Sequence, residues 1–162
     1  MTTNLVMSDE DEASDKLSHQ ALAFFLHMII GLGAWFALML LGYAIQPSVP
    51  QTFILSASFI VPAAVGFLYL RARPEPMAGH IWLAGLIWLM IISLWIVDMP
   101  TGPNACNDCG ATDKITRTLF SFPRPSGLID DNGPFICTWP AAALIGYSIG
   151  ARLGMRRKES SD

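Results

Sequence analysis

The stretch that decides the fold is "ALAFFLHMIIGLGAWFALMLLGYAI", Ala21–Ile45, which contains no Asp, Glu, Lys or Arg. A helix needs about 20 consecutive apolar residues to cross the hydrocarbon core of a bilayer, so this run is long enough to span one with some tilt. A soluble core helix of the same length would carry a polar face, and this run has none. The stretch therefore predicts a transmembrane helix.

Three further apolar runs follow, at 53–70, 81–97 and 135–153, and the only charged residue in them is Arg152 near one end. The composition of the whole chain agrees, because 52% of its 162 residues are hydrophobic and 14% are charged. Soluble domains carry roughly 25% charged residues. With a mean hydropathy of +0.44, the sequence predicts an all-α integral membrane protein with four transmembrane helices.

The segments outside these runs are polar and rich in proline. "QPSVPQ" (46–51) and "RARPEPMAG" (71–79) predict tight connections between consecutive spans, because proline ends a helix. Residues 1–18 form an acidic stretch that buries no apolar surface, so we expect a disordered tail. The predicted organisation is this tail, a four-helix bundle over 19–154, and a basic tail over 155–162.

The orientation in the membrane follows from the lysine and arginine residues. With the N-terminus inside, three basic residues lie outside and seven lie inside, namely Lys16, Arg71, Arg73, Arg152, Arg156, Arg157 and Lys158. The positive-inside rule then predicts that both termini face the cytoplasm of a bacterial inner (plasma) membrane. A net charge of −3 without a basic stripe excludes a nucleic-acid partner, so the bilayer itself is the expected partner.

The predicted outer loop, 98–134, is long for a connection, at about 35 residues, and loops of that length carry structure or function. Within it, Thr112 or Asp113 is a candidate helix cap. Apolar residues then recur at helical spacing: Ile115, Leu119 and Phe122. We therefore expect a structured loop with a short amphipathic helix on the membrane surface.

The same loop holds the motif "ACNDC", in which Cys106 and Cys109 form a C-x-x-C pair, and Cys137 lies at the start of the fourth span. A zinc or iron–sulfur site needs four ligands, and the outer side supplies three cysteines and no histidine. Covalent haem needs histidine directly after the pair, where this chain has Gly110. The motif therefore indicates disulfide chemistry, and we predict no metal site.

Two roles for these cysteines remain open. In the first, Cys137 pairs with Cys106 or Cys109 and clamps the ends of the loop, which is worth roughly 3–4 kcal/mol for a loop of about 30 residues. In the second, all three are redox residues, since C-x-x-C pairs exchange disulfides. A four-span chain with cysteines on the outer face resembles, in topology, the bacterial DsbB and VKOR-type quinone-linked disulfide-forming proteins. That resemblance implies quinone as a cofactor.

DsbB-type proteins use two cysteine pairs, and this chain departs from that pattern. Its first outer connection, "QPSVPQT", contains no cysteine, and three cysteines cannot make two bridges. The redox role would therefore require a partner protein that supplies the missing thiol.

The fourth span carries a row of small residues at four-residue spacing: Ala142, Gly146, Gly150 and Gly154. Such a row lets another helix approach closely in lipid. The partner helix belongs either to the same bundle, which we favour, or to another subunit, including a second copy of this chain.

Few ionisable residues lie within the spans. His27 lies in the first span and His80 opens the third, so the two are candidate ligands of a b-type haem. The alternative is that they are hydrogen-bonded or interfacial histidines. Because no other buried charge marks an ion path, we expect a non-catalytic accessory or assembly subunit of a membrane complex without a cofactor. A quinone-linked oxidoreductase and a small b-haem protein are the alternatives.

Overall fold

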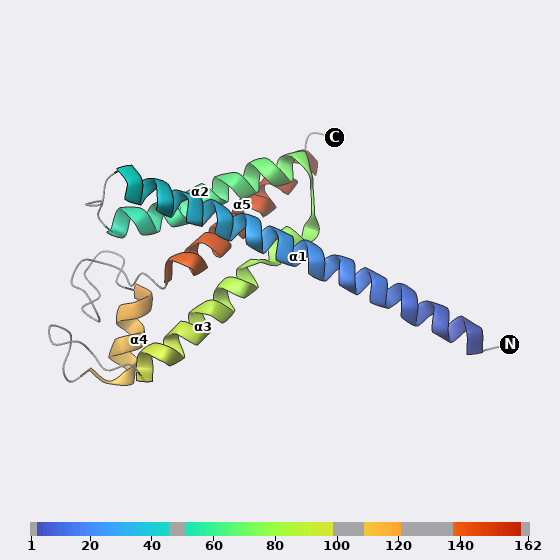
Figure 1. The fold of residues 1–162 in the computed structure, drawn as a ribbon, viewed down its shortest axis with the longest axis horizontal. Coiled ribbons are helices and arrows are strands. Elements are labelled where there is room, and N and C mark those ends of the chain that lie inside the picture. The colour runs from blue at the N-terminus through green and yellow to red at the C-terminus, as the bar shows by residue number, and fades with distance from the viewer. Residues whose placement is uncertain (1–2, 46–50, 99–108, 121–137, 160–162) are drawn as a thin grey trace.

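We analysed a computed structural model of the chain, which describes residues 3–45, 51–98, 109–120 and 138–159 (Figure 1). Every element in these ranges is helical. In chain order they are α1 (Thr3–Ile45), α2 (Gln51–Ala72), the 3-10 helix η1 (Pro76–His80), α3 (Trp82–Asp98), α4 (Ala111–Phe120) and α5 (Trp139–Glu159). The predicted all-α class is confirmed.

Within these ranges, three segments are long and apolar enough to cross a membrane: Ser14–Gly42, Phe53–Ala72 and Pro76–Asp98. They correspond to the first three predicted spans and show a membrane-embedded helical protein. The third extends the predicted span by including η1. The predicted fourth span falls on α5, which is interrupted by glycine, serine, tyrosine and arginine, and its crossing of the membrane stays a prediction.

The centre of the bundle is α5, against which α2, α3, α1 and η1 all pack. Its Tyr147 and Ala151 are fully buried, together with Leu70 of α2 and Ile81 before α3. Gly146 faces Phe59 and Gly154 faces Phe67 on α2. The residue numbers of the facing positions increase in the same direction on both helices, so α2 and α5 run parallel.

By the same comparison, α3 runs antiparallel to α5. Gly79, just before α3, faces Arg152, whereas Gly85 faces Ala141 and Leu144. In α1, Gly31 faces Tyr147, while Trp35 lines a groove together with α5 residues nearer its start, so α1 is antiparallel to α5 as well. Successive long helices therefore alternate in direction.

The surface of the bundle is apolar and its interior contains polar groups. Large apolar side chains more than half exposed occur along α1, α2 and α3; examples are Phe36, Leu41, Ile60, Leu68, Met90 and Leu94. The buried polar residues include His27, Ser58 and Ser148. This distribution suits a protein surrounded by lipid, in which apolar side chains face the lipid and polar side chains join helices to one another.

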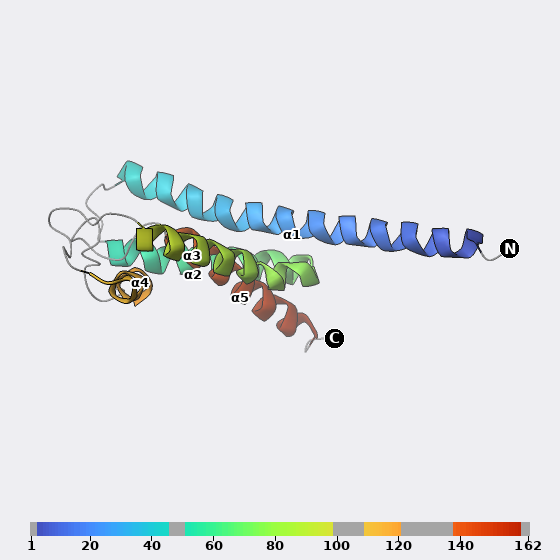
Figure 2. The same cartoon turned by 90° about the horizontal axis from the view of Figure 1, so that it is seen from below.

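The N-terminal part of α1 lies in the stretch 1–18 for which a disordered tail is predicted, and residues 3–18 are helical. The helix begins at Thr3 and extends well beyond the bundle (Figure 2). The stretch contains neither proline nor glycine. Extending an existing helix gains one hydrogen bond for each residue that is fixed and avoids the cost of nucleation. The acidic stretch can therefore extend the helix formed by the apolar run in the N-terminal direction.

The predicted helix of the outer loop is present as α4. It begins at Ala111, one residue before Thr112, so neither Thr112 nor Asp113 caps it; instead the Gly110 carbonyl accepts from the Lys114 backbone N–H at 3.1 Å. Lys114 Nζ also donates to the carbonyl of Val97 at 3.2 Å, which ties α4 to the end of α3. The remainder of the outer loop lies outside the described residues.

Candidate functional site

The row of small residues on α5 packs against α2 within the chain. A Cβ atom at three of its glycines would overlap a backbone carbonyl of α2, pairing Gly146 with Phe59, Gly150 with Ala63 and Gly154 with Phe67. Backbones this close allow Cα–H···O contacts at successive turns, each worth perhaps 0.5–1 kcal/mol. Ala142, one turn earlier, is half-buried. The row therefore holds α5 to α2.

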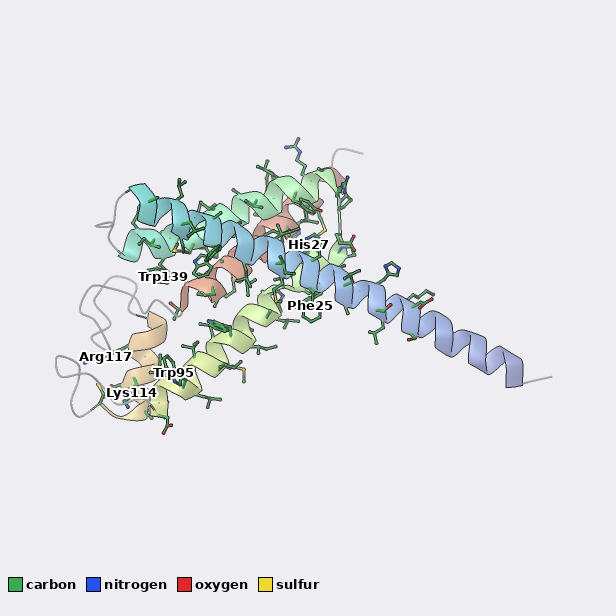
Figure 3. The ribbon with its side chains drawn as sticks, viewed as in Figure 1. Phe25, His27, Trp95, Lys114, Arg117 and Trp139 are labelled. Atoms are coloured by element: carbon green, nitrogen blue, oxygen red, sulfur yellow. The ribbon has the colours of Figure 1, made fainter. Side chains whose placement is uncertain are left out.

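A second feature of the interior is a polar contact between α1 and α5. His27, which is 3% exposed, shares a hydrogen bond of 2.8 Å between its Nδ1 and the hydroxyl of the fully buried Tyr147. The ring of Tyr69 on α2 meets the imidazole edge-on, with centroids 5.6 Å apart. Three helices thus meet at His27, which Figure 3 labels on α1.

Glu75 belongs to the same region. It lies in the connection between α2 and η1, is half-buried, and is close enough for its carboxylate to act electrostatically on His27. Sequence reasoning selected His27 but missed Tyr147 and Glu75. No sequence signal could have linked positions so far apart in the chain.

The third feature holds η1 against α5. The carbonyl of Gly79 accepts two hydrogen bonds from α5, one from Ser148 Oγ at 2.7 Å and one from Arg152 Nε at 2.9 Å. In a membrane, irregular backbone must find partners within the protein, because lipid offers none. The two donors stand one helical turn apart on α5. The sequence marked one of them, because Arg152 is the only charged residue in its apolar run.

The two candidate haem ligands lie in different environments. His27 is buried among three helices, whereas His80 is exposed and donates through Nδ1 to the carbonyl of Pro76 at 3.2 Å. A bis-histidine haem needs both rings directed into one cavity. Neither histidine lines the large groove of the bundle.

That groove, of about 800 Å³, lies between α1, α3 and α5. Its lining is apolar and consists of Met28, Ile29, Leu32, Gly33, Trp35, Phe36, Ala84, Trp88, Pro140 and Leu144. The indole nitrogen of Trp35 is buried and has no hydrogen-bond partner within the described ranges. The groove suits an apolar molecule or an apolar side-chain ridge, and it offers no group for acid–base chemistry.

Of the three cysteines, only Cys109 falls within the described part of the chain. It is half-buried, directly precedes α4, and is disulfide-bonded. Cys106 and Cys137 lie outside the described residues, so the pairing of Cys137 with Cys106 or Cys109 stays a prediction. Because α4 is tied to α3 through Lys114, which Figure 3 labels near Trp95, Cys109 is held near the C-terminal end of α3.

Among the residues that the structure describes, no group of three or more His, Cys, Asp or Glu side chains is arranged to hold a metal ion. Comparison of the chain with protein-family models, with curated proteins and with solved structures found no significant match.

Proposed function

We propose that this chain is a non-catalytic integral membrane protein with four spans, both termini inside, which serves as an accessory or assembly subunit of a membrane complex. The observation that carries this proposal is how the polar groups between its helices are used. His27 joins α1 to α5, and Ser148 and Arg152 join α5 to η1. These groups hold helices together, and in the described ranges they form no chain of ionisable residues along the membrane normal.

The direction of α5 supports a fourth crossing. In a bundle whose connections alternate sides, the second and fourth spans run parallel, as α2 and α5 do. The glycines that lower the hydropathy of α5 face α2, and its Ser148 faces η1, so these residues avoid lipid. A helix packed against three others needs less apolar surface than a helix that faces lipid on most sides.

The apolar groove supports contact with a partner helix. The glycine row on α5 already packs on α2, so it is not available to a second copy of the chain or to another subunit in this arrangement. No side chain that the structure describes fills the groove between α1, α3 and α5. We therefore place the proposed partner at α1 and α3 and not at the fourth helix.

Purification in a mild detergent tests this proposal, and two glycines of α1 provide matched variants. A Cβ at Gly33 or at Gly42 would meet no atom within 4 Å, but only Gly33 lines the groove. We expect a partner to co-purify with the wild-type protein, to be lost with Gly33→Leu and to be retained with Gly42→Leu. A wild-type chain that elutes alone as a monomer would contradict the proposal.

A quinone-linked thiol–disulfide oxidoreductase is the second candidate, and the disulfide at Cys109 is consistent with it as it is with the loop clamp. In that reaction a cysteine dithiol would be oxidised to a disulfide while a quinone is reduced to the quinol. Mass spectrometry after alkylation without reduction identifies the bridged pair. A Cys106–Cys109 bridge that a mild dithiol reduces would support this candidate, and a Cys137 bridge that resists reduction would exclude it.

A further inference from the structure

Among the side chains that the structure describes, those of four arginines lie where α2 and α5 end. Arg71 lies in the last turn of α2 and Arg73 follows the helix, while Arg152 and Arg156 lie one turn apart near the end of α5. Because the two helices run parallel, their C-terminal ends lie side by side. A Cβ at Gly154 would stand 3.3 Å from the backbone nitrogen of Arg71. All four arginine side chains are exposed.

These arginines have donors to spare. A guanidinium carries five N–H donors, and Arg152 uses its Nε–H on the Gly79 carbonyl, which leaves four. Among the side chains that the structure describes, none pairs with the guanidinium of Arg71, Arg73 or Arg156. The Gly79 contact also anchors Arg152, so less side-chain entropy is lost when its remaining donors bind a ligand.

The charge at this end stays positive after its neighbours are counted. The C-termini of α2 and α5 each contribute roughly half a negative charge. Among the side chains described at this end, the carboxylate is that of Glu75, which is half-buried. The acidic N-terminal part of α1, drawn in blue, runs away from the ends of α2 and α5 in both views, so it does not cover the arginines (Figures 1 and 2).

We propose that these arginines, which we call the arginine patch (Arg71, Arg73, Arg152 and Arg156), bind the headgroup of an anionic phospholipid. Guanidinium forks match the oxygens of a phosphate in pairs. Basic clusters at the cytoplasmic ends of membrane helices meet the anionic leaflet at headgroup level, with about 1 kcal/mol gained for each arginine. The proposal rests on the proposed topology, which places this end of the bundle at the inner face.

Native mass spectrometry of the purified full-length protein in a non-ionic detergent tests this site, with phosphatidylglycerol and phosphatidylcholine as probes. The main variant is Arg73→Gln/Arg156→Gln, because neither side chain holds the fold together. The matched control is Arg117→Gln, an exposed arginine of α4. We expect wild-type protein to bind phosphatidylglycerol more tightly than phosphatidylcholine. The double variant should bind phosphatidylglycerol about 25-fold more weakly, at about five-fold per arginine, with Arg117→Gln unchanged.

A second variant, Arg152→Gln, should weaken phosphatidylglycerol binding about five-fold by the same reasoning. Equal affinity for the two lipids, or an equal loss with Arg117→Gln, would overturn the proposal. Displacement of the lipid by millimolar inorganic phosphate would assign the patch to a free anion and also overturn it. Because these measurements are made in detergent, they do not depend on sidedness, so a failure here leaves the topology and subunit proposals to their own tests.

Discussion

Tyr147 shows how a single polar residue positions a helix inside an apolar bundle. It is fully buried, its hydroxyl bonds His27, and its ring fills the space in front of Gly31, where a Cβ would stand 3.3 Å from the tyrosine Cγ. In hydrocarbon an unsatisfied polar group costs several kcal/mol. The hydrogen bond therefore favours the observed position of α1, because a shift of α1 along α5 would separate His27 from Tyr147.

The first prediction concerns this pair. Tyr147→Phe keeps the ring but leaves His27 Nδ1 without its hydroxyl partner, and we expect a loss of about 1–3 kcal/mol in the free energy of unfolding. The measurement is denaturant unfolding in detergent micelles. In the double variant with His27→Leu, the added loss should be small, because the interaction is already broken. Fully additive losses would show that the contact contributes nothing to stability.

The second prediction concerns the Gly79 carbonyl. Ser148→Ala removes a buried donor at 2.7 Å, although Arg152 still bonds the same oxygen, so we expect a loss of about 0.5–1.5 kcal/mol. Ser18→Ala is the matched control, since its hydroxyl bonds the Asp15 carbonyl at 2.8 Å on an exposed part of α1. Thermal unfolding should separate the two variants, and equal midpoints would contradict the proposed role of Ser148.

At the scale of elements, α5 organises the bundle because its small residues let α2 reach it. Gly66 of α2 takes part as well: a Cβ there would overlap the Tyr147 carbonyl, so the close approach involves glycines of both helices. Pro62 lies inside α2 and is fully buried, whereas Pro140 lies in the first turn of α5, where a missing N–H costs nothing. The backbones of α2 and α5 are thus in direct contact.

The third prediction tests this interface. Gly150→Ala would place a methyl group onto the Ala63 carbonyl, so the helices must separate, and overpacking of this kind costs typically 1–3 kcal/mol. Gly42→Ala is the control, because its Cβ meets no atom within 4 Å and alanine favours helix over glycine. Unfolding in micelles should show Gly150→Ala less stable and Gly42→Ala unchanged or more stable. The reverse order would refute the interface.

Sequence patterns predicted these elements to different extents. The spacing of Gly146, Gly150 and Gly154 indicated a helix-packing face, because small residues at every fourth position share one side of a helix. The spacing could not identify the facing helix. For the acidic stretch, composition predicts a disordered tail, whereas residues 3–18 are helical in the structure. Composition reports the lack of a core but not the propagation of an adjoining helix.

At the scale of the whole molecule, the structure is a bundle with an apolar exterior and a central helix, α5, against which the others pack. The two ends of the bundle carry different residues. One end carries the disulfide-bonded Cys109 and α4, and there Lys114 of α4 bonds the C-terminal end of α3. The other end carries the exposed arginines of α2 and α5. This asymmetry is the basis for the proposed orientation, because basic residues concentrate on the cytoplasmic side.

The fourth prediction is the sidedness of the chain. We expect a protease-cleavable tag at the C-terminus to be cut in inverted vesicles and protected in intact cells or spheroplasts. A tag inserted between α4 and α5 should show the opposite pattern. If α5 did not cross the bilayer, both tags would be cut from the same side, and the four-span proposal would fail.

The sequence by itself determined that the chain is helical and membrane-embedded, because uncharged runs such as Ala21–Ile45 leave the backbone no partners in lipid except its own. It also located α4 and the glycine face of α5. Only the tertiary structure decided that the face meets α2, that His27 meets Tyr147, and that Gly79 receives two donors from α5. Periodicity along one helix describes that helix alone, whereas these contacts join residues distant in the chain and depend on how the helices pack.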